Sequence, residues 1–129
     1  NYAGGEFEGG PNLKATHSWD DYQKTIDWET FEKETVSGNG FDAFGFAALA
    51  GGYFYAADGI DALNMFAAKG QYHGLGKQGY WWTATEYTNP NNGESIKATS
   101  RLIKNEAYHV QSSWENKGDN WFYVRCVKD

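Results

Sequence analysis

The clearest pattern of apolar and polar positions lies in the last third of the chain. Aromatic residues recur there in short runs, and clusters of Gly, Asn and Asp separate the runs, which is typical of strands joined by turns. The pattern predicts a meander of four strands over residues 79–87, 95–103, 106–113 and 120–128. Neither face of the first or the last strand is purely polar, so we expect both to be central strands that are covered on two sides.

Whether the two consecutive tryptophans, Trp81 and Trp82, are both buried depends on that expectation. Neighbouring side chains in a strand point to opposite faces, so both indoles are buried only if both faces of the sheet are covered. We therefore predict that both side chains are structural. Glu86 follows at the end of the same run. We expect its carboxylate to fix a loop by accepting hydrogen bonds from backbone N–H groups, so that Glu86→Gln would destabilise the fold.

The beginning of the chain has a weaker pattern. Residues 1–12 contain four Gly and one Pro and predict a loop or a flexible arm. Residues 13–19 predict a short strand. Residues 70–79, which also contain four Gly, predict a further loop.

Two segments favour helices. Trp19, Tyr22 and Ile26 have helical spacing, which predicts an irregular helix within residues 18–34. A long surface loop held by its aromatic residues is the alternative for this segment. Residues 61–70 predict one short helix that ends at its glycine.

Composition narrows the class of protein. The chain has 129 residues, which suffices for one compact domain, and its 18% aromatic residues and 16 glycines indicate a loop-rich protein with substantial sheet. The formal net charge is −6 and the basic residues are scattered singly, which argues against nucleic acid or an anionic membrane as partner. No apolar run approaches the roughly 20 residues of a membrane-spanning helix, so we expect no membrane insertion.

Aromatic and polar side chains gather in and beside one turn near the C-terminus. Aromatic rings stack on the apolar C–H faces of sugars, and carboxylates and amides bind their hydroxyl groups. We therefore predict a glycan-binding site at Trp114, Glu115, Asn116, Asp119, Asn120 and Trp121. The alternative is a tight turn, in which Asp and Asn form the turn and both Trp side chains pack inward.

Enzymatic signals are weak. His17, His73 and His109 do not have the spacing of a zinc site, and the glycine-rich stretch 74–79 is not followed by the Lys-Ser/Thr of a phosphate-binding loop. One cysteine cannot supply the cysteine pair that formylglycine-generating enzymes use. We therefore expect a protein that is not an enzyme. Cys126 itself is open to two interpretations, a small buried hydrophobic residue or a disulfide to a partner outside this chain.

Three blocks in fixed order, residues 42–53, 74–87 and 123–129, resemble the Fibrobacter succinogenes major paralogous domain family. The chain departs from the family pattern at Ala47 and Ala50, where Ser and Pro are common. The matching positions are Gly45, Phe46, Ala48, Leu49, Gly51, Gly52, Tyr53, Gly79, Tyr80, Trp81, Trp82, Thr85, Glu86, Val124, Arg125, Cys126, Val127 and Lys128.

The resemblance implies an α+β, C-type-lectin-like fold, with twisted antiparallel sheets, one or two helices and long loops on one side. Residues 1–129 would form a single domain that corresponds to the C-terminal two-thirds of the family domain, and residues 20–37 and 54–69 look like insertions. A cysteine of the absent upstream segment is then the expected disulfide partner of Cys126, and Arg125 is expected to be structural. An exported, bacterial cell-surface setting is also implied.

A calcium site is a further hypothesis. Residues 89–94 and 114–116 resemble the Glu-Pro-Asn and Trp-Asn-Asp motifs of calcium-dependent C-type lectins, although Asn replaces the first Glu and Glu-Asn replaces Asn-Asp. Calcium takes six to eight oxygen ligands. Several could come from Asn89, Asn91, Glu94, Glu115 and Asn116. We expect no other cofactor.

These observations favour a non-enzymatic binding or adhesion module of the bacterial cell surface, directed to a glycan through its loop face. The alternative is a structural subunit of an extracellular fibre or surface layer that is completed by a missing N-terminal segment or by a neighbouring chain. A calcium-dependent lectin is the third hypothesis.

Overall fold

The computed structural model describes residues 5–56 and 70–126, which form one helix and eight strands. The elements follow in the order α1 (Gly5–Leu13), β1 (Tyr22–Thr25), β2 (Lys33–Val36), β3 (Gly51–Tyr55), β4 (Gln71–Leu75), β5 (Gln78–Tyr87), β6 (Lys97–Lys104), β7 (Gln111–Asn116) and β8 (Asn120–Trp121). The protein is therefore rich in β-structure with little helix.

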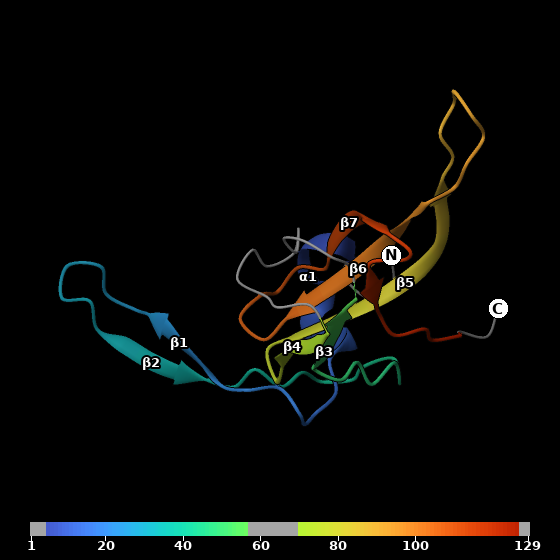
Figure 1. Cartoon of the computed structure of the whole chain (residues 1–129). Helices are drawn as coiled ribbons and strands as arrows, with labels where there is room; N and C mark the ends of the chain where they lie inside the picture. The colour runs from blue at the N-terminus through green and yellow to red at the C-terminus, as the bar shows by residue number, and fades with distance from the viewer. Residues whose placement is uncertain (1–4, 57–69, 127–129) are drawn as a thin grey trace.

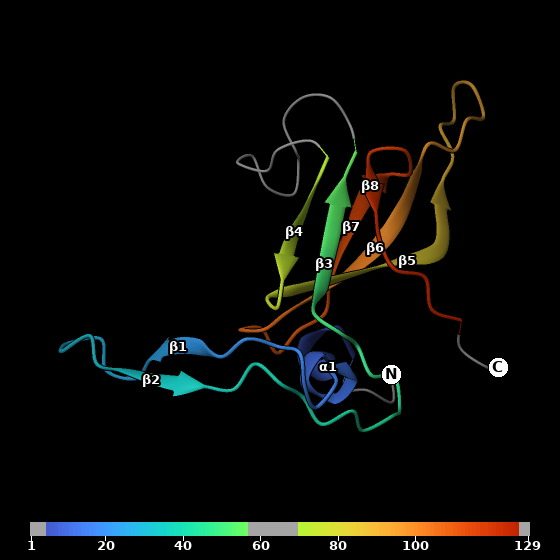
Figure 2. The same cartoon turned by 60° about the horizontal axis from the view of Figure 1, so that its bottom comes forward.

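Six of the strands make one curled sheet, in the order β4-β3-β5-β6-β7, with β8 paired to β3 outside this path. Strands β5, β6 and β7 are antiparallel neighbours and form its longest part, whereas β3 meets β5 in parallel only at Gly52 and Gly79. Strands β1 and β2 form a separate hairpin, which projects away from the rest of the molecule (Figures 1 and 2).

The core is divided into two clusters by β5. Trp81 packs on one side with Trp19, Ala48, Ala50 and Ile103. Tyr80 packs on the other side in a buried cluster of Tyr53, Tyr55 and Tyr80, which Leu102 and Phe122 extend.

Trp81 and Trp82 lie on opposite sides of β5. Trp81 is buried in the first cluster, while Trp82 is half-buried and lies against the ring of Phe122 with centroids 4.5 Å apart. The prediction that both faces of this strand are covered is therefore confirmed, completely for Trp81 and partly for Trp82. The segment that follows β8 also lies against β5, since Tyr123 forms an isolated parallel bridge with Trp81.

The predicted helix over residues 18–34 is wrong, because β1 and β2 form a hairpin there. Its turn is fixed by Asp27, whose Oδ1 accepts hydrogen bonds from the backbone N–H groups of Glu29 (2.7 Å) and Thr30 (3.2 Å). Such local side-chain bonds compete with helix formation. The helical spacing was coincidental, because Trp19 enters the core while Ile26 is exposed at the end of the hairpin.

The predicted arm over residues 1–12 is also wrong from residue 5 onward, where α1 begins. This helix packs tightly, because the backbone N–H of Gly10 donates to Tyr108 O (2.9 Å) and a Cβ at Gly10 would lie 2.8 Å from that oxygen. The strand expected at residues 13–19 is reduced to one bridge between Lys14 and Ala48.

The other predicted strands differ from the observed strands mainly in where they begin and end. Strands over 79–87 and 95–103 are confirmed, as β5 and β6. The strand expected at 106–113 begins only at residue 111, and the one expected at 120–128 ends at residue 121. The stretch expected to be a loop at 70–79 contains β4 and the start of β5, joined by a tight turn in which Gly76 has a φ of 78°. The helix expected at 61–70 falls, except for Gly70, outside the described residues.

Candidate functional site: an aromatic row across three strands

Strand β3 carries aromatic side chains on both of its faces. Tyr53 and Tyr55 are buried in the second core cluster. Phe54 stands between them in sequence and points to the opposite face, because successive side chains alternate along a strand. The outer face of β3 therefore presents one aromatic ring.

The strand register places two further rings beside Phe54. It is paired with Tyr72 of β4 on one side and with Trp121 of β8 on the other. Ring centroids are 5.0 Å apart for Phe54 and Tyr72 and 4.8 Å apart for Phe54 and Trp121. These three residues, called the aromatic row below, lie side by side across adjacent strands.

The outer members of the aromatic row are open to solvent. Tyr72 is 74% exposed and Trp121 is 61% exposed, while Phe54 between them is half-buried. Gly52 and Gly74, two residues along from Phe54 and Tyr72, have no side chains that could shield the rings. Large apolar side chains that are scattered singly on a surface need no explanation, but three in register form a continuous apolar patch.

Such a row can bind a ligand with a flat apolar face and a polar rim. Its rings supply apolar contact area at a low cost in side-chain entropy, because aromatic side chains have few rotatable bonds. The Tyr72 hydroxyl can donate and accept hydrogen bonds at the edge. Apolar ring faces and one phenolic hydroxyl group are contacts that bind a ligand of this kind.

The structure separates the six residues of the predicted glycan site. Trp121 joins the aromatic row, whereas Asn120 points to the buried side, opposite Tyr55. Trp114 is 49% exposed on β7 and contacts the ring of Tyr87, 6.0 Å away, at a different place on the surface.

The rest of that predicted site forms a turn. Asn116 donates through Nδ2 to Asp119 Oδ2 (2.7 Å), which ties the two ends of the β7–β8 turn together. Glu115 is buried and accepts a hydrogen bond from Ser113 Oγ (2.5 Å). The alternative of a tight turn is therefore correct for Asn116 and Asp119, but neither Trp packs inward.

Sequence reasoning missed Phe54 and Tyr72. The glycine neighbours of Tyr72 predict a loop, and Phe54 lies at the edge of a predicted insertion. The available signal was the run of three aromatic residues at 53–55, since in a half-buried strand the middle residue of such a run must face away from the core.

The five residues of the hypothetical calcium site are distributed over two places. Asn89, Asn91 and Glu94 lie in the loop between β5 and β6, where Asn89 Oδ1 accepts from the Asn91 backbone N–H (3.0 Å) and Glu94 Oε2 accepts from Asn92 Nδ2 (3.0 Å). Glu115 lies on β7 and is buried. Among residues 5–56 and 70–126, no three His, Cys, Asp or Glu side chains are grouped as metal ligands usually are.

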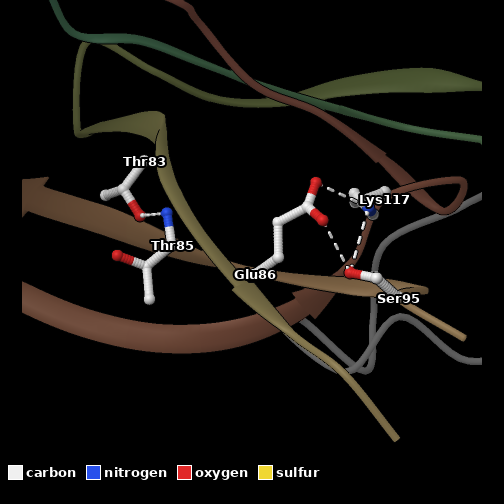
Figure 3. A network of polar contacts seen from close by, with 5 residues as sticks. All are labelled: Thr83, Thr85, Glu86, Ser95 and Lys117. Atoms are coloured by element: carbon white, nitrogen blue, oxygen red, sulfur yellow. Dashed lines mark hydrogen bonds and ion pairs between the residues drawn. The ribbon is translucent and has the colours of Figure 1, made fainter. Parts of the chain in front are cut away.

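Glu86 links three segments near the end of β5 (Figure 3). Its carboxylate accepts hydrogen bonds from Lys117 Nζ (2.9 Å) and Ser95 Oγ (2.8 Å). Both bonds lower the pKa of Glu86, and the bond from Lys117 has the larger effect. The expectation of backbone N–H donors is wrong, because both donors are side chains. The carboxylate does fix loops, since Ser95 precedes β6 and Lys117 follows β7.

A bend in β5 precedes this network. The pairing register of β5 with β6 shifts between Trp82 and Glu86. Thr83 Oγ1 lies in the shifted segment, where it donates to Thr99 O (2.9 Å) and accepts from the Thr85 backbone N–H (3.2 Å). Such an irregularity bends the strand and turns its final side chains in a new direction.

The two residues near the C-terminus have different environments. Arg125 donates to Gly45 O (3.2 Å) and lies over the ring of Phe46, so it joins the C-terminal segment to the loop that precedes β3. Cys126 is exposed and unpaired in the part of the chain that the structure describes. Its interpretation as a buried hydrophobic residue is wrong, and a disulfide to a partner outside this chain stays a prediction.

Comparisons of the chain with family models, with curated proteins and with solved structures found no match. No described helix is both long enough and apolar enough to cross a membrane.

Proposed function

We propose that this chain is a non-enzymatic glycan-binding module and that the aromatic row is its binding surface. One observation carries the proposal: Tyr72, Phe54 and Trp121 are in register on three neighbouring strands, and the two outer rings are largely exposed. Phe54 is tilted by 61° against Tyr72 and by 36° against Trp121, so the two exposed outer rings provide the faces on which sugar units can stack, and Phe54 supports both rings from between them.

The shape of the surface defines the class of glycan. The row lies on the outer face of a sheet and runs across its strands. A surface of this kind suits the middle of an extended polysaccharide, because such a chain can continue past both ends of the row.

The setting is part of the proposal. The resemblance to the Fibrobacter succinogenes major paralogous domain family supports a C-type-lectin-like fold and a place on the bacterial cell surface. A β-rich chain with a curled sheet and little helix is compatible with that fold. The hypothetical calcium dependence has less support, because Asn89 and Glu94 use side-chain oxygens to hold their own loop.

A depletion assay tests the proposal. The protein is mixed with insoluble β-glucan, xylan, mannan and chitin, with and without a calcium chelator, and the unbound fraction is measured. We expect binding to at least one extended polysaccharide, unaffected by the chelator and weakened at least about tenfold by Trp121→Ala or Tyr72→Ala, as for aromatic residues that dominate an interface.

Two other variants make the result specific. Phe44→Ala removes an exposed aromatic ring outside the row and should leave the affinity unchanged. Trp114→Ala tests whether the glycan instead binds at the turn that the sequence predicted as the site. Binding that is lost with Trp114→Ala and retained with Trp121→Ala would move the site to that turn and reject the aromatic row.

A further inference from the structure

The β1–β2 hairpin is a second candidate interaction surface, independent of the aromatic row. Its strands pair only with each other within residues 5–56 and 70–126, and it projects from the body as an arm (Figure 2). Residues 26–32, called the tip below, join β1 to β2 at its end. A projecting tip can contact a partner before any other part of the molecule does.

The tip displays large apolar side chains. Trp28 is 75% exposed, Phe31 is 68% exposed and Ile26 is 49% exposed. Single apolar residues on a surface need no explanation, but three within one short turn are a concentration of apolar area. Tryptophan is also one of the residue types that contribute most of the binding energy at protein interfaces. The tip therefore has the composition of an interaction surface.

The backbone of the tip is ordered. Asp27 Oδ1 accepts hydrogen bonds from the backbone N–H groups two and three residues later (2.7 and 3.2 Å), and the Ile26 N–H donates to Glu32 O (2.9 Å). Phe31 has a φ of 56°, an unfavourable value for a bulky residue, and strain of this kind concentrates at functional positions. An ordered tip loses little conformational entropy when it binds.

The tip is also strongly acidic. It contains Asp27, Glu29 and Glu32 but no lysine or arginine, and Glu29 and Glu32 are exposed. Residues 20–36 as a whole carry six carboxylates and two lysines, so this stretch holds −4 of the formal net charge of −6. Negative charge and exposed aromatic rings are therefore concentrated in the same arm.

The base of the hairpin has the same sign of charge. Burial and a hydrogen bond raise the pKa of Tyr22, and the negative charges of Glu106 and Glu34 raise it further, so both carboxylates lie near the base. Asp20, which precedes β1, is exposed. The Lys14 side chain nearby is buried and donates to two backbone carbonyls, so its ammonium group is already occupied. The acidic surface therefore continues from the tip toward the body.

Aromatic rings and carboxylates together favour one class of partner. The face of an aromatic ring attracts a cation, and a carboxylate can accept two parallel hydrogen bonds from a guanidinium group. Arginine makes both contacts better than lysine, because its planar group is weakly hydrated and stacks on rings. The carboxylates disfavour an anionic membrane, and a purely apolar surface would leave them without partners.

We propose that the tip binds an arginine-rich segment of a partner protein. Guanidinium groups of this segment stack on Trp28 and Phe31 and pair with the carboxylates of the tip. Charge complementarity extends along the arm, because the base is acidic as well. Neither outer edge of the hairpin is paired within the described part of the chain, so an extended segment can also add to it as a strand.

Fluorescence anisotropy tests the proposal. The probes are a fluorescein-labelled peptide of alternating glycine and arginine and a matched peptide in which lysine replaces arginine. We expect the arginine peptide to bind at least about threefold more tightly than the lysine peptide, because only the guanidinium group stacks well. No binding of the arginine peptide at low salt, or equal affinity for both peptides, would overturn the proposal.

Variants of the rings locate the binding surface. Trp28→Ala with Phe31→Ala should weaken binding of the arginine peptide at least about tenfold, as for aromatic residues at the centre of an interface. Both rings lie outside the two core clusters, so the variant should keep its fold. Phe44→Ala with Ile96→Ala removes two exposed apolar side chains elsewhere and should have no effect. Equal affinity of the two double variants would reject the tip as the site.

A matched pair of charge variants separates the tip from the net charge of the protein. Glu29→Gln and Glu94→Gln each remove one exposed carboxylate, the second in the loop between β5 and β6. Only Glu29→Gln should weaken binding of the arginine peptide, by about threefold, as expected for an exposed ion pair. Equal losses in both variants would mean that the peptide responds to net charge alone, and would reject the proposal.

Two further assays cover other occupants of the tip. Sedimentation velocity detects self-association, and flotation with zwitterionic vesicles detects binding to lipid. We expect neither to depend on Trp28 and Phe31. Self-association or vesicle binding that is lost in the double variant would assign the tip to a second copy or to a lipid surface and overturn the proposal. None of these measurements uses a glycan, so their outcome is independent of the aromatic row.

Discussion

The two faces of β3 carry the same kind of side chain in opposite environments. On the inner face, Tyr53 and Tyr55 are buried against Tyr80. On the outer face, Phe54 lies between the two exposed rings of the aromatic row. Aromatic residues at neighbouring positions therefore stabilise the core on one side and present a binding surface on the other.

Charged groups show the same contrast. Lys14 is buried and donates to backbone carbonyls, while Lys117 is partly exposed and pairs with Glu86 at the surface. Residue type alone gives neither the energetic weight nor the role of a side chain in this protein. Strand register and burial decide both, and the variants below test that conclusion.

The largest effect is expected from the inner face of β3. Tyr53→Ala should lower the free energy of unfolding by about 3–5 kcal/mol, because it removes a ring packed against Tyr80 and Phe122 and leaves a cavity. Tyr72→Ala, on the outer face of the neighbouring strand, should cost less than about 1 kcal/mol. Chemical denaturation of the two variants measures the difference, and equal losses would contradict the assigned register.

Positions 53 and 72 should have the opposite order of importance for polysaccharide affinity. Tyr72→Ala should weaken the affinity for an extended polysaccharide by about tenfold, whereas Tyr53→Phe, which retains the buried ring, should leave it unchanged. Affinity electrophoresis in gels that contain the soluble polysaccharide measures both. A loss for Tyr53→Phe that matched the loss for Tyr72→Ala would place the binding surface elsewhere.

The buried amine of Lys14 should make the stability of the protein depend on pH. Burial lowers the pKa of Lys14 to about 8 from its ordinary value of 10.5. Between pH 8 and about 10 the unfolded chain therefore holds more protons at this amine than the folded chain does, so Lys14 makes stability rise with pH. Above about pH 10, Tyr22 acts in the opposite direction, because burial and its hydrogen bond with Tyr108 raise its pKa.

Denaturation at pH 7, 8, 9 and 10 measures this contribution. Lys14→Met should remove its part of the rise between pH 8 and 10, whereas Lys24→Met, at an exposed position of β1, should retain it. A pH profile that is identical in the Lys14→Met variant and the unmodified chain would mean that this amine is solvated in the folded state.

The smallest effect is expected at Glu86. The structure revises the loss of stability that the sequence predicted for Glu86→Gln, because both members of the ion pair are exposed and such pairs contribute little. This variant should therefore change the melting temperature by no more than about 2 °C at neutral pH. The pKa of Glu86 is lowered in the folded state, so its contribution is present above the ordinary pKa of a glutamate and is lost as the pH falls through the lowered value. The difference between variant and unmodified chain should therefore vanish in acid and at high salt, and a difference that persists in 1 M salt would indicate a buried role.

The sequence predicted the parts of the fold that depend on long apolar runs. Strands β5 and β6 and the burial of Trp81 could be predicted, because runs of ten and eight residues rich in aromatic and β-branched side chains leave little doubt about the type of element. The hairpin could not be found in this way. Its strands are only four residues each, and the spacing of Trp19, Tyr22 and Ile26 fits a helix equally well.

The candidate site was harder to predict, because it depends on pairing between distant segments. Only the register of β3 with β4 and β8 brings Phe54 beside Tyr72 and Trp121, which are separated by 18 and 67 positions along the chain. Pairing over such distances leaves no local trace in the sequence. The turn at residues 116–119, which has a local signature, was recognised as one alternative.

The position of Tyr123 has a consequence for how the polypeptide is made. Its backbone N–H donates to Tyr80 O and its carbonyl accepts from Trp82 N–H, both at 3.0 Å, so a segment near the C-terminus supplies a neighbour to the longest strand. A ribosome that has finished β5 must still translate more than thirty residues before that neighbour exists. Until then Tyr80 and Trp82 lack the backbone partner that Tyr123 supplies, so a chaperone that shields aromatic segments should raise the yield of folded protein.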